Sequence, residues 1–152
     1  MYIAQMNGNT IVKIDHYRHW FKNVPSDETL ARRGFKKVNK FLPHNNLTQK
    51  LEGTNPFVDG NFVTTVKVVN LTADEITANK ASSLSQIRSQ RNQLLLNTDW
   101  SQVADSTANK SAYASYRVEL RNVPQQIASA DLDPRTWSDW PSLSLEGASA
   151  GG

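Results

Sequence analysis

The sequence predicts an α+β fold: a small antiparallel β-sheet with one short helix, followed by a long helix, a helical hairpin and an extended C-terminal tail. Three observations lead to this prediction. Asn7-Gly8 lies between two short strand-like segments, and this dipeptide favours a hairpin turn because it accepts positive φ. Residues 63–69 form a β-branched run, the strongest strand signal in the chain. After residue 71 the apolar residues recur at helical spacing.

Residues 1–70 are predicted to form a β-rich domain. Its short helix lies within residues 26–34, which begin with capping residues and end with a glycine that supplies a left-handed exit. Residues 49–53 and 62–71 are expected to pair as strands. The connection between them contains two turn signals, Asn55-Pro56 and Asp59-Gly60.

Residues 71–124 are predicted to form the helical hairpin region. Thr72 and Glu75 have the spacing of a capping box, which starts a helix of roughly 20 residues. A loop over residues 98–110 leads into a second amphipathic stretch. Pro124 is expected to end that stretch, because proline cannot donate the backbone hydrogen bond of a helix interior.

Residues 125–152 are predicted to form an extended tail that contacts a partner. The segment has no periodicity, and its composition is typical of disorder. It nevertheless carries Trp137 and Trp140. Two interpretations stay open for these indoles: they anchor a partner protein, or the tail folds back and they cap the hairpin of their own chain.

The pair Asp99-Trp100 lies where the first hairpin helix should end. Two helices with narrow apolar stripes bury little between themselves, so Trp100 is expected to fold over Leu95 and Tyr116 as a plug. Asp99 is expected to cap the following turn or to pair with an arginine of the neighbouring helix. A structural role therefore explains Asp99-Trp100, and no catalytic or ligand-binding role is needed.

The composition argues against an enzyme. Cysteine is absent, which excludes disulfides, thiolate metal sites and cysteine nucleophiles. No serine-nucleophile motif or phosphate-binding glycine loop occurs, so no catalytic residue and no cofactor are expected. His16 and His19 lack a third nearby ligand, and His44 is expected to lie in a loop, so no metal site is expected. No apolar run approaches the roughly 18 residues of a membrane span, so no membrane contact is expected.

The charge is distributed unevenly. Residues 1–50 carry a formal charge of +6 and residues 51–152 carry −3. The basic residues of the N-terminal third make nucleic-acid binding an alternative function. Lysines that coat strand edges and a short helix explain the same charge, and no nucleic-acid-binding motif accompanies it.

The second half of the chain carries several motifs in order. An arginine-containing helix is followed by Asp-Trp, then by Tyr-Arg-x-x-Leu-Arg, and finally by Trp-Pro. Over roughly residues 48–141 this pattern resembles bacteriophage tail-fibre assembly and tail-assembly chaperone-like proteins. Val118-Glu119 and the ends of the chain depart from that pattern. The matching positions are Arg88, Arg91, Asn92, Leu95, Asp99, Trp100, Asp105, Tyr116, Arg117, Leu120, Arg121, Pro124, Trp140 and Pro141.

The resemblance implies a non-enzymatic protein that acts by docking to other tail, baseplate or fibre proteins, or to copies of itself. Our expectation is a structural component of the virion tail that is also present in the host cytoplasm during assembly. The alternative is a tail-fibre assembly chaperone that is absent from the finished particle. The residues expected to contact a partner are Trp137, Trp140, Tyr113, Leu143 and Leu145. Those expected to build the hairpin are Arg91, Leu95, Asp99, Trp100, Tyr116, Arg117 and Leu120.

Overall fold

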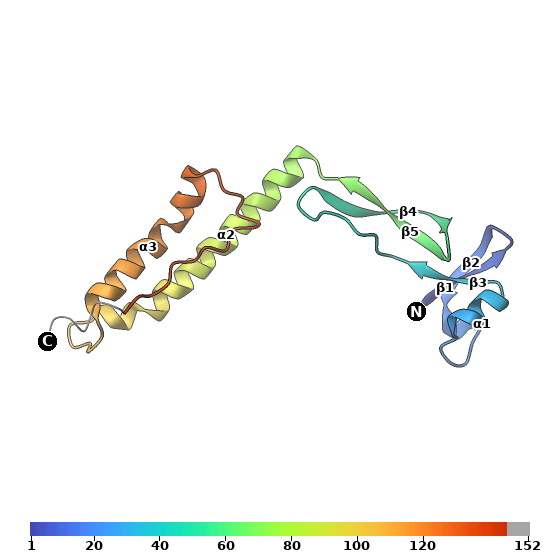
Figure 1. The fold of residues 1–152 in the computed structure, drawn as a ribbon, viewed down its shortest axis with the longest axis horizontal. Helices are drawn as coiled ribbons and strands as arrows, with labels where there is room; N and C mark the ends of the chain where they lie inside the picture. Colours follow the sequence, from blue (N-terminus) through green and yellow to red (C-terminus); the bar gives the residue numbers. More distant parts are fainter. Residues whose placement is uncertain (146–152) are drawn as a thin grey trace. The chain divides into compact units, whose positions relative to one another are not determined.

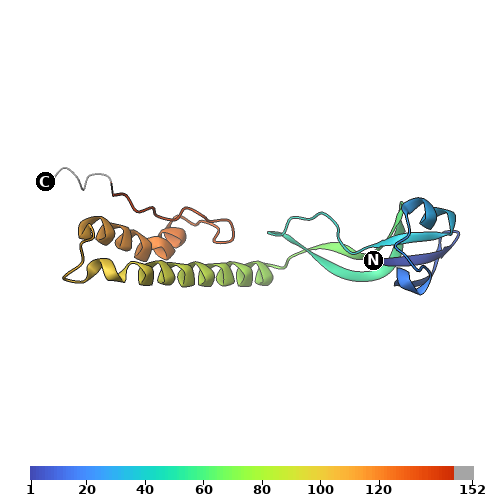
Figure 2. The same ribbon diagram turned by 90° about the horizontal axis from the view of Figure 1, so that it is seen from below.

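The structure is a computed structural model that describes residues 1–145 (Figures 1 and 2). It divides into two compact units, Met1–Thr72 and the chain from Ala73 onward. The small-residue end of the tail, residues 146–152, lies outside the described residues. The fold is α+β as predicted: a β-sheet with one short helix precedes two long helices.

The first unit is built on a curled five-stranded sheet with the strand order β2-β1-β3-β5-β4. The β1–β2 hairpin turns at Gly8, whose φ of 60° bears out the turn signal. β3 and β5 pair in parallel, so the sheet is mixed and the prediction of an antiparallel sheet was wrong on this point. Parallel pairing is possible because the chain between them, including β4, returns to the same end of the sheet. The strands are β1 (Tyr2–Asn7), β2 (Thr10–His16), β3 (Phe35–Asn39), β4 (Gln49–Asp59) and β5 (Phe62–Asn70).

The connection expected between residues 53 and 62 is itself mostly strand. β4 continues through Asn55-Pro56, where the β4–β5 register shifts between Gly53 and Phe57. Proline is tolerated there because β4 is an edge strand, whose outward N–H groups need no partner strand. The expected turn at Asn55-Pro56 was therefore wrong. The turn at Gly60, with φ of 55°, is confirmed.

The core of the first unit lies between the sheet and α1 (Asp27–Arg32). The Ser26 hydroxyl accepts a hydrogen bond from the Thr29 amide at 3.2 Å, which confirms the predicted cap of α1. Gly34 follows with φ of 74°, a conformation that favours glycine. The buried residues of this core are Ile3, Tyr17, Leu30 and Phe35, against which Trp20 and Phe21 pack.

The second unit is a hairpin of two helices, α2 (Ala73–Asn97) and α3 (Lys110–Ser129), with the short 3-10 helix η2 (Asp99–Gln102) in its turn. The predicted long helix is therefore the first arm of the hairpin and not a separate element. α3 also continues through Pro124, so the predicted end at that residue was wrong. An interior proline costs about 3 kcal/mol. Burial of Val123 and Ile127 on either side of it offsets that cost.

Candidate functional site

The helical hairpin has a narrow apolar core that its own tail completes. Ile87 of α2 packs against Val123 and Ile127 of α3, and each of these residues is less than 10% exposed. After α3 the chain turns back, and residues 130–145 run along the hairpin toward its turn (Figures 1 and 2). We call residues 133–145 the strap. Its Trp137 and Trp140 pack on the hairpin core together with Leu84.

The two indoles of the strap contact each other as well as the helices. Their ring centroids lie 4.9 Å apart at an interplanar angle of 72°, an edge-to-face arrangement favoured by the quadrupoles of the rings. Both side chains are half-buried. The structure thus shows the second of the two interpretations, in which the tail caps the hairpin of its own chain. Contact of Trp137 or Trp140 with a partner stays a prediction.

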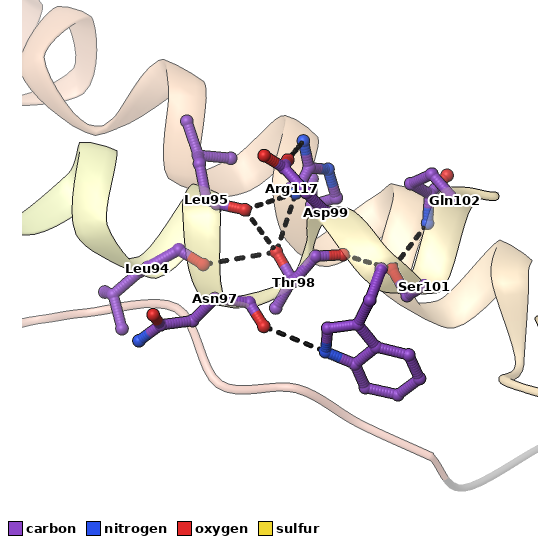
Figure 3. A network of polar contacts seen from close by, with 9 residues as sticks. Leu94, Leu95, Asn97, Thr98, Asp99, Ser101, Gln102 and Arg117 are labelled. Atoms are coloured by element: carbon purple, nitrogen blue, oxygen red, sulfur yellow. Dashed lines mark hydrogen bonds and ion pairs between the residues drawn. The ribbon is translucent and has the colours of Figure 1, made fainter.

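A buried arginine ties the turn of the hairpin to α3 (Figure 3). The Arg117 guanidinium donates to the Leu95 carbonyl at 2.5 Å and to the Thr98 hydroxyl at 2.8 Å. It also donates to the Asp99 carboxylate at 2.6 Å, which confirms the predicted pairing of Asp99 with an arginine of the neighbouring helix. Because Arg117 is only 9% exposed, its charge depends on these three acceptors for stabilisation.

The side chains of the turn satisfy the last carbonyl groups of α2, which have no partners within the helix. Thr98 donates its hydroxyl to the Leu94 and Leu95 carbonyls, and the Ser101 hydroxyl donates to the Thr98 carbonyl at 2.6 Å. Ser101 is fully buried. The Trp100 indole N–H donates to the Asn97 carbonyl at 2.9 Å (Figure 3). The sequence Asn-Thr-Asp-Trp-Ser is therefore a helix cap made largely of side chains.

The expected role of Trp100 as a plug is wrong. Its side chain is 54% exposed, and its ring contacts Tyr113 edge-on with 5.4 Å between centroids. Arg117 occupies the interior of the turn instead, because its guanidinium can reach several carbonyl and hydroxyl oxygens at once, as an indole cannot. Leu96 and Val103 are exposed as well, at 63% and 51%. We call Leu96, Trp100 and Val103 the turn patch.

The strap begins at a helix end of the Schellman type. The Leu132 amide donates to the Ile127 carbonyl at 3.0 Å, and the Asp131 amide donates to the Ala128 carbonyl at 3.3 Å. Asp131 has φ of 51°, and it is the only non-glycine residue with positive φ among those described. The chain therefore leaves α3 through a conformation that glycine adopts more readily.

A charged pair holds the first residues of the strap. The Arg135 guanidinium donates to both oxygens of the Asp133 carboxylate, at 2.7 Å from Nη2 to Oδ2 and from Nε at 3.0 Å to Oδ1 and 3.2 Å to Oδ2. These hydrogen bonds, with a further contribution from Lys80 of α2, lower the pKa of Asp133 to about 2. The same contact raises the pKa of Arg135.

The other residues singled out in the sequence have varied environments. Leu120 is fully buried, while Leu95 and Tyr116 are half-buried. Arg91 donates to the neighbouring Asn92 amide oxygen at 2.9 Å. In the strap, Leu143 is half-buried and Leu145 is 54% exposed. Contact of Tyr113, Leu143 and Leu145 with a partner stays a prediction.

Sequence reasoning missed Thr98 and Ser101, which organise the turn. A signal existed for both, because hydroxyl residues next to a helix end commonly bond the last free carbonyls.

Four basic residues of the first unit lie over aromatic rings of the same unit: Lys13, Arg18, Arg33 and Lys40. Arg33 lies 4.7 Å from the centroid of Phe21, and Lys13 lies 5.6 Å from that of Trp20. Both rings pack against the core of the unit. They are therefore not free platforms on which bases could stack, and the nucleic-acid alternative gains no support.

The first unit also contains a pocket of about 610 Å³ beside α1 and β3. Two lysines line it. Lys37 pairs with Asp27 at 2.5 Å, and Lys36 donates to the Gly60 carbonyl.

Within residues 1–145 no group of three or more His, Asp or Glu side chains is placed to hold a metal. In the same part of the chain no helix has the length and apolar character needed to cross a membrane.

Comparison with known proteins points to the second unit. Residues 84–143 match the family model described as phage tail assembly chaperone protein. The resemblance to tail-assembly chaperones is thus confirmed over this stretch, which runs from the middle of α2 to Leu143 of the strap. The sheet lies outside the match. No curated protein and no solved structure matches the chain. The family description favours the chaperone alternative over a structural virion component.

Proposed function

We propose that this protein is a non-enzymatic assembly chaperone for a bacteriophage tail protein, its client, which it binds in the host cytoplasm before the tail is complete. The observation that carries the proposal is that the family match falls on the second unit, from Leu84 to Leu143. This range contains both Trp residues of the strap, the whole of α3 and the turn with its Arg117 network. A retained virion component is the second candidate, and it has less support from the comparison.

The turn patch is the surface that we propose for the first contact with the client. Trp100 and Val103 are more than half exposed in the turn, which Arg117, Thr98 and Ser101 hold in one conformation. Leu96, also more than half exposed, lies in the last turn of α2. An ordered aromatic side chain loses little conformational freedom on binding, which is why tryptophan often dominates the binding energy of protein interfaces. Tyr113 supports the Trp100 ring and extends the surface.

Co-expression tests the proposal. The protein would be produced together with each tail, baseplate and fibre protein encoded near it, and the yield of soluble complex would be measured. We expect one of these proteins to be soluble and bound only in the presence of the chaperone. The matched variants are Trp100→Ala in the turn patch and Val12→Ala, which changes a 58% exposed apolar residue in the first unit. Only the first should weaken the complex.

Mass spectrometry of purified virions separates the two candidates. A chaperone is absent from finished particles, whereas a virion component is present at a fixed ratio to the other tail proteins. Stoichiometric recovery from virions would overturn the chaperone proposal. Solubility of every candidate client without this protein would do so as well.

A further inference from the structure

The strap is held to the hairpin almost entirely through side chains. Residues 136–145 make hydrogen bonds only within the strap, from Thr136 to Asp133 and from the Trp140 amide to the Ser138 carbonyl. Among the described residues none of these ten donates to or accepts from α2 or α3. Trp137 and Trp140, both half-buried, supply the attachment. A segment attached in this way can leave its seat without breaking a single backbone hydrogen bond to the helices.

The seat of the strap is an apolar groove between α2 and α3. Leu84 and Ile87, three positions apart, lie on one face of α2. Val123 and Ile127 form the other wall at i and i+4 of α3.

The strap presents two aromatic residues, three positions apart, to this groove. Their indoles bury apolar area against the hairpin core.

We propose that the groove between α2 and α3 is a docking site for an extended segment of the client tail protein, and that the strap is its resident occupant, which the client segment replaces. The segment carries two aromatic residues spaced as Trp137 and Trp140 are. This inference rests on the proposed function for the identity of the client, while the existence of the site does not depend on it.

Replacement has a quantitative consequence. A tethered strap competes with an effective concentration in the millimolar range, so a free segment of equal intrinsic affinity binds weakly while the strap is seated. Weakening the strap should therefore raise the affinity of the groove for the same segment in trans. The strap also runs toward the turn of the hairpin (Figure 1). A client held first by the turn patch would be concentrated beside the groove.

A peptide with the sequence of residues 132–145 is the probe for this site. Its binding to the full-length chain is measured by fluorescence anisotropy of an attached dye, for the wild type and for the double variant Trp137→Ala/Trp140→Ala. We expect at least tenfold tighter binding to the double variant. A peptide in which both tryptophans are alanine should not bind.

Equal binding to both chains, or no binding to a folded double variant, would overturn the inference. If the double variant does not fold, the wild-type chain decides, with its four tryptophans replaced by 5-fluorotryptophan. Excess unlabelled peptide should then shift two of the four ¹⁹F signals, those of Trp137 and Trp140, toward solvent-exposed positions. Unchanged signals at saturating peptide would contradict strap replacement. The peptide experiment can fail while co-expression still identifies a client, so the groove and the chaperone role are tested separately.

Discussion

The Arg117 guanidinium of α3 and the Asp99 carboxylate of the hairpin turn lie 2.6 Å apart, although 18 residues separate them in the sequence. The same guanidinium reaches the end of α2 through the Leu95 carbonyl. One buried side chain therefore fixes the angle at which the chain leaves α2, together with the position from which the turn patch is presented.

Replacing Arg117 should destabilise the second unit. Arg117→Ala leaves the Leu95 carbonyl and the Thr98 hydroxyl without this donor, which we expect to cost about 2–3 kcal/mol in the free energy of unfolding. Urea denaturation followed by helical circular dichroism measures the change. Arg117→Lys keeps the positive charge but lacks the planar guanidinium that can donate to several acceptors at once. It should therefore lower the free energy of unfolding by less than Arg117→Ala does. A loss below about 0.5 kcal/mol for the alanine variant would show that the network does not hold the turn.

Trp100 should matter more for binding than for stability. Because its side chain is 54% exposed, Trp100→Ala should lower the free energy of unfolding by no more than about 1 kcal/mol, mainly through the lost cap on the Asn97 carbonyl. Its effect on a client complex should be at least tenfold in Kd, a size typical of an interface anchor. Denaturation and titration calorimetry on the same preparation check both parts. A large stability loss with unchanged affinity would reverse the assignment.

The hinge at Asp131 predicts an order of stability among three variants. The observed φ of 51° at residue 131 costs glycine no strain. Aspartate tolerates this conformation better than alanine does, because a short polar side chain can form a local hydrogen bond and a methyl group cannot. Asp131→Gly should therefore stabilise the second unit by about 0.5–1 kcal/mol, and Asp131→Ala should destabilise it by a similar amount. Thermal denaturation of the three proteins gives the order. Asp131→Ala as the most stable of them would be incompatible with the described hinge.

Acid should loosen the strap at its beginning. The pKa of Asp133 is lowered to about 2 by its hydrogen bonds to Arg135, so the contribution of this contact is complete above the unfolded value near 3.8. The contribution is lost as the pH falls through about 2. Tryptophan emission of a chain carrying Trp20→Phe and Trp100→Phe reports the strap alone. Between pH 4 and pH 1.5 its emission should move to the red, and Asp133→Asn should shift that transition or remove it.

The first unit contains a buried hydroxyl without a partner. Thr64 is fully buried on β5, and its Oγ1 makes no hydrogen bond among the described residues. Thr64→Val replaces this hydroxyl with a methyl group of similar size, so we expect a gain of about 1 kcal/mol in the free energy of unfolding. Thr65→Val, at the half-buried neighbouring position, is the control and should change stability less. Destabilisation by Thr64→Val would indicate a water or backbone partner for this hydroxyl.

Prediction from the sequence succeeded where a signal is local. The Gly8 and Gly60 turns, the Ser26 cap and the start of α2 at residue 73 each depend on a few adjacent residues whose backbone preferences act alone. Pro124 shows the limit of that reasoning. Its local preference is to end a helix, but burial of Val123 and Ile127 outweighs that preference.

For the functional unit, the sequence by itself predicted two helices joined by a loop, offered pairing with an arginine as one of two roles for Asp99, and carried a resemblance to tail-assembly chaperones over roughly residues 48–141. The family model matches residues 84–143, which begin within that range and extend just beyond it. Only the tertiary structure decided that Arg117, and not Trp100, occupies the turn, and that the strap returns to the hairpin core. Likewise, only the structure revealed the parallel pairing of β3 and β5. The physical reason is the same in each case. These contacts join residues far apart in the chain, and their energy depends on burial that no local pattern records.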